Sequence, residues 1–134
     1  MKLQRLLIGL GLALSTAFAI GQTPSYPTKP IKLIATYGPG SSIDIIARLI
    51  AKPLSEQMGQ PVVVENKPGA GGDLGTNVVA KAEKDGYTIG FASAGPITVN
   101  PNARKKMPYD SMTDLAPVAL IATVTRMIAQ PQLP

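Results

Sequence analysis

The sequence contains no cysteine, no histidine and no tryptophan, and only 4% of its residues are aromatic. Without cysteine the chain can form no disulfide, no thiolate zinc site and no thiol nucleophile. Without histidine it lacks the side chain that most often serves as a general base or a metal ligand. Its few aromatic residues also offer little surface for stacking nucleic-acid bases. We therefore expect a protein that is not an enzyme, needs no cofactor or metal, and binds no nucleic acid.

The amino terminus has the pattern of a cleavable secretory signal. Lys2 and Arg5 supply positive charge, the 15 residues Leu6–Ile20 carry none, and small residues precede a cleavage position near Ala19. A membrane-spanning helix is the alternative, but it needs about 20 apolar residues. We predict export to the periplasm, with a signal peptide at 1–19, an extended linker at 20–30 and a folded region at 31–134.

The charge of the chain is mildly basic. The net charge of +5 falls to +3 once Lys2 and Arg5 are removed. This excess is too small to indicate a nucleic-acid partner. The one basic run, Arg104-Lys105-Lys106, is interpreted as a solvated face.

Short apolar runs alternate with amphipathic segments along the chain. We predict buried strands over Ile31–Tyr37, Pro61–Glu65 and Tyr87–Ala92, with a helix in each interval. This order calls for crossover connections and a parallel sheet, and so for an α/β fold. Two more apolar runs, Pro117–Thr123 and Arg126–Ala129, are plausible further strands.

Capping residues mark the ends of the two expected helices. Ser41 precedes Asp44 by three residues and is expected to cap the first helix, which Gly59 would end. Pro53 is expected to kink that helix or to end its regular part near Lys52. Asp73 is expected to cap the second helix.

Three glycine-containing loops follow the three predicted strands: Gly38–Asp44, Pro68–Gly75 and Ser93–Pro96. In parallel sheets, ligands bind outside the carboxyl ends of the strands, where all three loops fall. A loop that opens a helix also exposes backbone N–H groups, which favour anions by about 0.3–1 kcal/mol. The loops therefore predict a pocket for a carboxylate or a phosphate.

The loops do not match the known nucleotide motifs. Gly69-Ala70-Gly71 lacks the third glycine of a dinucleotide fingerprint at the required place, and the chain has no phosphate-binding P-loop. Ser41, Ser42 and Ser93 have no histidine to activate them, so we interpret them as capping groups and ligand contacts.

The carboxylates and Tyr37 leave alternatives open. Asp44 and Asp73 are candidates for acid–base chemistry or for a hard metal, but satisfying N–H groups at their own helix starts is the favoured interpretation. Tyr37 is interpreted either as a ligand wall or as a core residue.

Several longer motifs resemble one known family. They are Tyr26–Ile34, the Gly38–Asp44 loop running into Ile45-Ile46-Ala47-Arg48, Gly59–Gly72, Asp85–Thr88, Asn100-Pro101, Met107–Asp110 and Asp114–Val118. Together they are similar to the substrate-binding receptors of tripartite tricarboxylate transporters, the Bug-type periplasmic binding proteins. The resemblance covers essentially the whole chain after the signal peptide.

The resemblance implies a two-lobed receptor that captures a small mono-, di- or tricarboxylate and delivers it to integral membrane transporter subunits. A periplasmic ligand-sensing module that feeds a signalling partner is the alternative. Family members are two to three times longer, so we expect this chain to be an incomplete first lobe without the second. Gly38, Ser41 and Ile43 depart from the family's usual first loop, which leaves the identity of the carboxylate open.

The resemblance also implies that main-chain N–H groups and hydroxyls of the loops hold the ligand's carboxylate. The candidate ligand-binding residues are Tyr37, Gly40, Ser41, Ser42, Asp44, Ala70, Gly71, Gly72, Asp73, Ser93, Ala94 and Gly95.

Overall fold

The computed structural model describes residues 25–123, so the predicted signal peptide and the run Arg126–Ala129 lie outside the described residues. Three parallel strands form one sheet in the order β2-β1-β3, with β1 in the middle. The elements, in chain order, are β1 (Ile31–Ala35), α2 (Ser42–Met58), β2 (Val62–Asn66), η1 (Ala70–Gly72), α3 (Asp73–Ala80), β3 (Thr88–Phe91), η2 (Gly95–Val99) and α4 (Asn100–Ala103).

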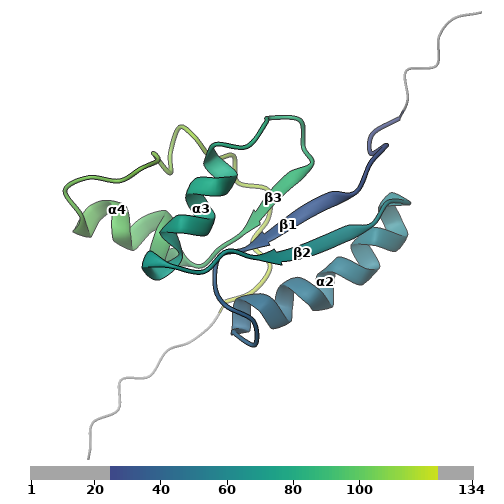
Figure 1. Ribbon diagram of the computed structural model, residues 1–134, viewed down its shortest axis with the longest axis horizontal. Helices are drawn as coiled ribbons and strands as arrows, with labels where there is room; N and C mark the ends of the chain where they lie inside the picture. The colour runs from purple at the N-terminus through teal and green to yellow at the C-terminus, as the bar shows by residue number, and fades with distance from the viewer. Residues whose placement is uncertain (1–24, 124–134) are drawn as a thin grey trace, which may run out of the picture.

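Helices cover both faces of this sheet. The chain moves from β1 to β2 through α2 and then passes to the other side of β1 through α3. The two helices accordingly lie on opposite faces, as Figure 1 shows. The chain therefore crosses first to one side of β1 and then to the other. In open parallel sheets, ligands bind in the crevice at the carboxyl ends of the strands where this change of direction occurs.

The core lies between the sheet and α2. Alternate residues of β1 point to this face, and Ile31, Leu33 and Ala35 are almost completely buried there. Ala47 and Ala51 of α2 are buried against them, and their small side chains let the helix approach the sheet closely.

The opposite face depends on small residues in α3 and β3. A Cβ atom added at Gly75 would lie 2.7 Å from the carbonyl oxygen of Lys67 and 2.9 Å from the Cα of Thr36. Helix α3 therefore sits so close to β1 that no side chain fits at this position. Its buried residues are Asp73, Gly75 and Thr76, whereas Leu74 and Val78 are exposed.

Helix α2 begins and ends where expected, but the expectation that Pro53 ends its regular part is wrong. The Ser41 hydroxyl accepts a hydrogen bond from the Asp44 N–H, and Gly59 ends the helix with a left-handed φ of 66°. The helix continues through Pro53 to Met58. Pro53 lies on the exposed side, where helix hydrogen bonds are weakest, so losing one donor there is tolerated.

The chain after β3 differs from two expectations. Ser93–Pro96 is only partly a loop, because one π-helical turn begins at Gly95 and runs into α4. The predicted strand Pro117–Thr123 is wrong: these residues form neither strand nor helix. Val118 and Leu120 are 84% and 85% exposed, so within the described part of the chain the apolar run pairs with no strand.

Residues 25–30 contain no helix or strand but are attached to the turn before β3. The Tyr26 hydroxyl donates to the Gly86 carbonyl at 2.7 Å, and Lys29 pairs with Asp85 at 3.0 Å. This attachment lies at the amino ends of β1 and β3, away from the glycine-containing loops. Between residues 25 and 123, no helix is both long and apolar enough to span a bilayer.

Candidate functional site

Tyr37 joins the loops that follow all three strands. Its hydroxyl donates to the Gly71 carbonyl at 3.0 Å and lies 3.0 Å from the Ser93 hydroxyl, which can donate to it in turn. Tyr37 follows β1, Gly71 follows β2 and Ser93 follows β3. The expectation that the three loops meet at one edge of the sheet is therefore confirmed. The ring is half-buried, and its hydroxyl bridges the second and third loops.

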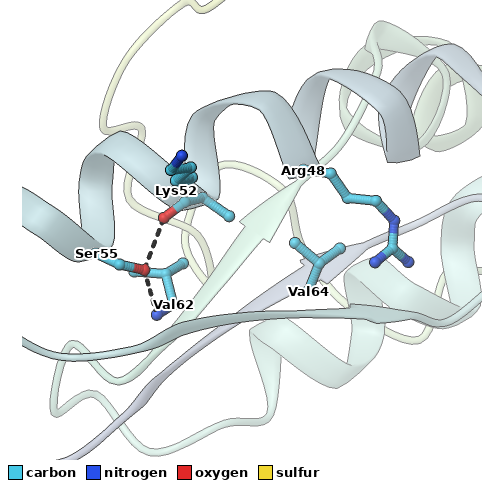
Figure 2. Close-up of a pocket in the computed structure, with 6 residues that line it drawn as sticks. Arg48, Lys52, Ser55, Val62 and Val64 are labelled. Carbon is cyan, nitrogen blue, oxygen red and sulfur yellow. Dashed lines mark hydrogen bonds between the residues drawn. The ribbon is translucent and has the colours of Figure 1, made fainter.

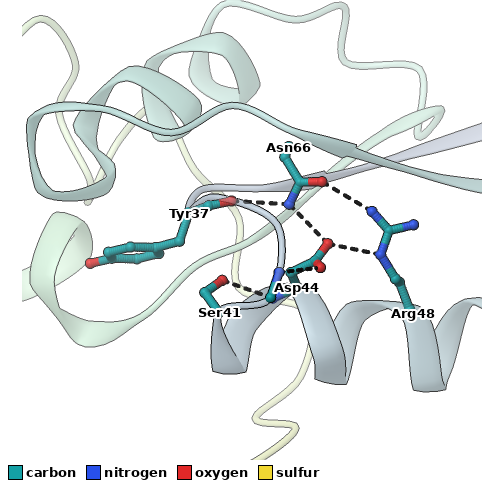
Figure 3. Close-up of polar contacts among 6 residues, drawn as sticks. Tyr37, Ser41, Asp44, Arg48 and Asn66 are labelled. Carbon is teal, nitrogen blue, oxygen red and sulfur yellow. Dashed lines mark hydrogen bonds and ion pairs between the residues drawn. The ribbon is translucent and has the colours of Figure 1, made fainter.

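The first loop is organised around the Asp44 carboxylate, which is buried at the start of α2 (Figure 3). Its Oδ2 accepts from the Gly40 N–H at 2.9 Å, and its Oδ1 accepts from Arg48 Nε and Asn66 Nδ2, each at 2.9 Å. The hydrogen bond from Arg48, followed by those from Gly40 and Asn66, lowers the pKa of Asp44 to about 2. Asp44 thus satisfies one backbone N–H, that of Gly40 just before the helix, and two side-chain donors, so the interpretation that it satisfies N–H groups at its own helix start holds only for the loop residue Gly40.

Asn66 ties this network to the sheet. Its side-chain amide donates both to Asp44 and to the carbonyl of Tyr37, while its side-chain oxygen accepts from Arg48 at 3.1 Å. The carboxyl ends of β1 and β2 and the start of α2 are thus locked together. Sequence reasoning did not select Asn66 as a site residue; its place at the end of the second strand was the available indication.

Some amides of the first loop are already engaged and others are not. The Gly40 N–H donates to Asp44, and the Ser41 N–H donates to the Gly38 carbonyl at 3.2 Å. In the part of the chain that the structure describes, the N–H groups of Ser42 and Ile43 donate to no protein acceptor. Ser42 is exposed and Ile43 is half-buried. The first turn of α2 therefore presents two backbone donors.

The second loop has an unusual run of left-handed residues. Ala70, Gly71 and Gly72 have φ values of 51°, 70° and 98°. The Gly72 and Leu74 N–H groups both turn back onto the Gly69 carbonyl, at 2.9 and 3.4 Å. The Gly69 carbonyl thus already accepts two of the N–H groups at the start of α3. The exposed Ala70 and Gly71 have N–H groups with no acceptor among residues 25–123.

The expectation that Asp73 caps α3 is wrong. Gly72 occupies the capping position, and the Asp73 carboxylate, only 3% exposed, turns instead toward the segment after η2. Its Oδ1 accepts from Asn100 Nδ2 at 2.6 Å and from the Tyr109 hydroxyl at 3.1 Å. Arg104 Nη1 lies 2.6 Å from Oδ2, in an ion pair that lacks hydrogen-bond geometry.

Tyr109 and Arg104 are functional candidates that sequence reasoning missed. The Tyr109 hydroxyl also lies 2.6 Å from the Pro96 carbonyl; burial, and then the Asp73 carboxylate, raises the pKa of Tyr109 to about 12. Arg104 does not lie on a purely solvated face, because it contacts both Asp73 and the Ala70 carbonyl. The motifs containing Asn100 and Tyr109 were visible in the sequence, but nothing local connected them to Asp73.

The third loop forms a wall beside the second. Ser93 contacts Tyr37, and a Cβ atom added at Gly95 would lie 3.3 Å from the Tyr37 hydroxyl and 3.7 Å from the Gly71 carbonyl. Ala94 is exposed at the start of the π-helical turn. A ligand contact from these residues remains a prediction.

A separate hollow of about 340 Å³ lies between α2 and β2 (Figure 2). It is lined by Arg48, Ala51, Lys52, Ser55, Val62 and Val64. The Ser55 hydroxyl within it is already bonded to the Ala51 carbonyl and the Val62 N–H. None of the predicted ligand-binding residues lines this hollow, so we place the candidate site at the loops.

The chemistry available at the loops is recognition of an anion. The loops present main-chain N–H donors and the exposed Ser42 hydroxyl, and both carboxylates are held by arginine and asparagine partners. Between residues 25 and 123, no cluster of three or more acidic residues could hold a metal ion.

Comparisons with known proteins agree with this description. Residues 46–134 match the family described as "Tripartite tricarboxylate transporter family receptor". Protein BugT of Bordetella pertussis is 38% identical over 137 residues, which cover 99% of this chain and 42% of that protein. The chain thus spans about two fifths of the length of this curated relative.

Two solved structures share the fold. MatC from Rhodopseudomonas palustris with bound malate is 30% identical, with a TM-score of 0.63, over 66% of this chain and 30% of that one. An R. palustris protein solved with adipate is 35% identical, with a TM-score of 0.59, over 66% of this chain and 29% of that one. The expected α/β fold with a parallel sheet is confirmed, and the chain belongs to the receptor family of the tripartite tricarboxylate transporters.

Proposed function

We propose that this chain is the carboxylate-binding first lobe of a solute receptor, and that its ligand is a small organic dicarboxylate. The first and second loops hold one carboxylate between them through the free N–H groups of Ser42, Ile43, Ala70 and Gly71. Serine hydroxyls at 41, 42 and 93 and the Tyr37 ring complete the wall around it.

One observation carries this proposal: four backbone donors that meet no acceptor among residues 25–123 lie on two loops that Tyr37 and Asn66 tie to the same end of the sheet. Backbone donors fixed in this way bind an anion without having to reorganise, and the positive end of α2 adds to the attraction. A carboxylate satisfies several such donors at once.

Internal charge balance supports an anionic ligand. Asp44 and Asp73 would repel an approaching carboxylate, but each is paired with an arginine that is about half exposed. The local charge at each loop is therefore close to neutral, and the N–H donors decide the preference. Malate and adipate, the ligands of the two solved relatives, are dicarboxylates of different length, so we expect the loops to recognise the shared carboxylate.

The wider role is part of the same proposal. The signal pattern at residues 1–19 and the family membership support a receptor that works in the periplasm and hands its ligand to integral membrane transporter subunits. The purified chain has no catalytic step of its own in this account.

Isothermal titration calorimetry at millimolar ligand tests the proposal. We expect malate and adipate to bind the purified chain, and dimethyl malate, which has the same carbon skeleton without charge, to give no heat of binding. Equal binding of the ester, or no binding of either dicarboxylate, would overturn the proposal for this chain.

A further inference from the structure

Arg104 belongs to none of the glycine-containing loops, but its side chain donates a hydrogen bond to the Ala70 carbonyl of the second loop. We propose that Arg104 is a positioning residue that aims the Gly71 N–H at the ligand by bridging the Asp73 carboxylate and the Ala70 carbonyl. The ligand part of this inference rests on the proposed function, whereas the loop part does not.

The bridge is defined by two contacts of one guanidinium group. Arg104 Nη1 lies 2.6 Å from Asp73 Oδ2, and Nη2 donates to the Ala70 carbonyl at 3.2 Å. Asp73 is a fixed anchor, since Asn100 and Tyr109 hold its other oxygen and the carboxylate is buried. The guanidinium group is therefore held beside a rigid partner by an ion pair, while its Nη2 donates a hydrogen bond to the loop.

Planarity of the peptide bond transmits this contact to the proposed ligand donor. The Ala70 carbonyl and the Gly71 N–H belong to one trans peptide unit, so they point in opposite directions. When Arg104 holds the Ala70 carbonyl, the Gly71 N–H therefore points away from Arg104. Tyr37 acts in the same way on the next peptide unit. Its hydroxyl donates to the Gly71 carbonyl, and the Gly72 N–H of the same unit donates to the Gly69 carbonyl.

The loop needs such support because of its backbone conformation. Ala70 has a φ of 51°, a conformation that residues with a Cβ atom seldom adopt, and two left-handed glycines follow it. Glycine has many accessible backbone conformations. Without an external contact, the peptide unit between Ala70 and Gly71 would be free to turn.

Arginine suits this task better than lysine. Its planar group carries several donors at fixed angles and can bond two acceptors at once, whereas an ammonium on a flexible chain acts as a point charge. We therefore expect Arg104→Lys to keep the charge opposite Asp73 but to lose the simultaneous contact with Ala70. This variant separates positioning from charge neutralisation.

The test uses Arg104→Gln, Arg104→Lys and a charge-matched control, Lys105→Gln, whose exposed side chain makes no ion pair among the described residues. The first measurement, made without ligand, is the heteronuclear ¹H–¹⁵N NOE of the Gly71 amide. We expect it to fall in both Arg104 variants and to stay unchanged in the control. The second is the Kd for malate, which we expect to rise about tenfold or more in both Arg104 variants.

The outcomes are distinct. Far-UV circular dichroism checks folding, and Arg104→Lys, which retains the ion pair, serves if Arg104→Gln does not fold. A Gly71 amide as rigid in Arg104→Lys as in the wild type would overturn the inference, whatever the ligand data show. If the amide loosens but wild-type protein fails to bind malate, the positioning role stands and the proposed function falls.

Discussion

Asp44 and Asp73 both lie in the first turn of a helix, as the third residue of α2 and the first residue of α3, and each carboxylate is held by one asparagine and one arginine. The partners differ in where they come from. Asp44 uses Arg48 from the same helix, whereas Asp73 uses Asn100 and Arg104 from the segment after β3. At the residue scale, these contacts leave the loop N–H groups as the groups free to bind an anion.

Gly71 is the position at which we expect an added side chain to impair ligand binding. We expect Gly71→Val to abolish malate binding, because a β-branched residue at φ 70° is strained and its Cβ would point at Asn100 and Arg104, which hold the loop. Gly38→Ala is the matched control, since a Cβ atom there meets nothing within 4 Å. Calorimetry on both variants checks this; retained binding in Gly71→Val would remove the second loop from the site.

The pKa of Asp44 predicts a pH dependence of stability. A carboxyl whose pKa is lowered by folding, from 3.8 to about 2 here, contributes stability that is present above pH 4 and lost as the pH falls toward 2. We expect the free energy of unfolding of Asp44→Asn to vary less with pH than that of the wild type in this window. Urea unfolding at pH 5, 4, 3 and 2 measures it, and parallel curves for the two proteins would contradict the assignment.

Local residues were predictable from the sequence and distant ones were not. The Ser41 cap depends on a contact three residues away, which a sequence motif records. The cap expected of Asp73 was wrong because its actual partners, Asn100 and Tyr109, lie 27 and 36 residues further along. Arg104 was misinterpreted for the same reason: a basic run looks solvated until the fold brings a carboxylate to it.

At the scale of elements, close approach of α3 to β1 sets the place of the second loop. Strand positions followed directly from the apolar runs, since β1, β2 and β3 lie within the predicted ranges to about one residue. The run at residues 117–123 failed as a strand because hydrophobicity alone does not supply a pairing edge. The closeness of α3 was not predictable, because it depends on Gly75 facing the backbone of another element.

Gly75→Ala tests this packing. Helix propensity alone would favour alanine by about 1 kcal/mol. The added Cβ atom would lie under 3 Å from two backbone atoms, however, and overpacking costs about 1–3 kcal/mol. We therefore expect net destabilisation in urea unfolding and a displaced second loop with weaker malate binding. A variant as stable as the wild type would show that α3 is less tightly packed than described.

At the scale of the whole molecule, apolar surface remains open. Leu49 of α2 is 68% exposed, and Val118, Leu120 and Ile121 are also exposed. A three-stranded sheet with helices on both faces therefore buries only part of its apolar residues. We expect the isolated chain to be marginally stable, to melt below about 60 °C and to associate with itself as concentration rises.

Leu49→Lys tests the source of this association. Because the side chain is mostly exposed, we expect the substitution to reduce self-association in sedimentation velocity while leaving the melting temperature nearly unchanged. The exposed Lys52→Gln substitution on the same helix controls for altered charge. A cooperative transition well above 60 °C in wild-type protein, with no concentration dependence, would contradict the prediction.

An amide-resolved titration of ¹⁵N-labelled protein with malate tests the central claim most directly, because it follows each proposed donor separately. The account predicts that the largest chemical-shift changes fall on the N–H groups of Ser42, Ile43, Ala70 and Gly71. Changes confined to the hollow between α2 and β2, or spread evenly over the surface, would contradict it.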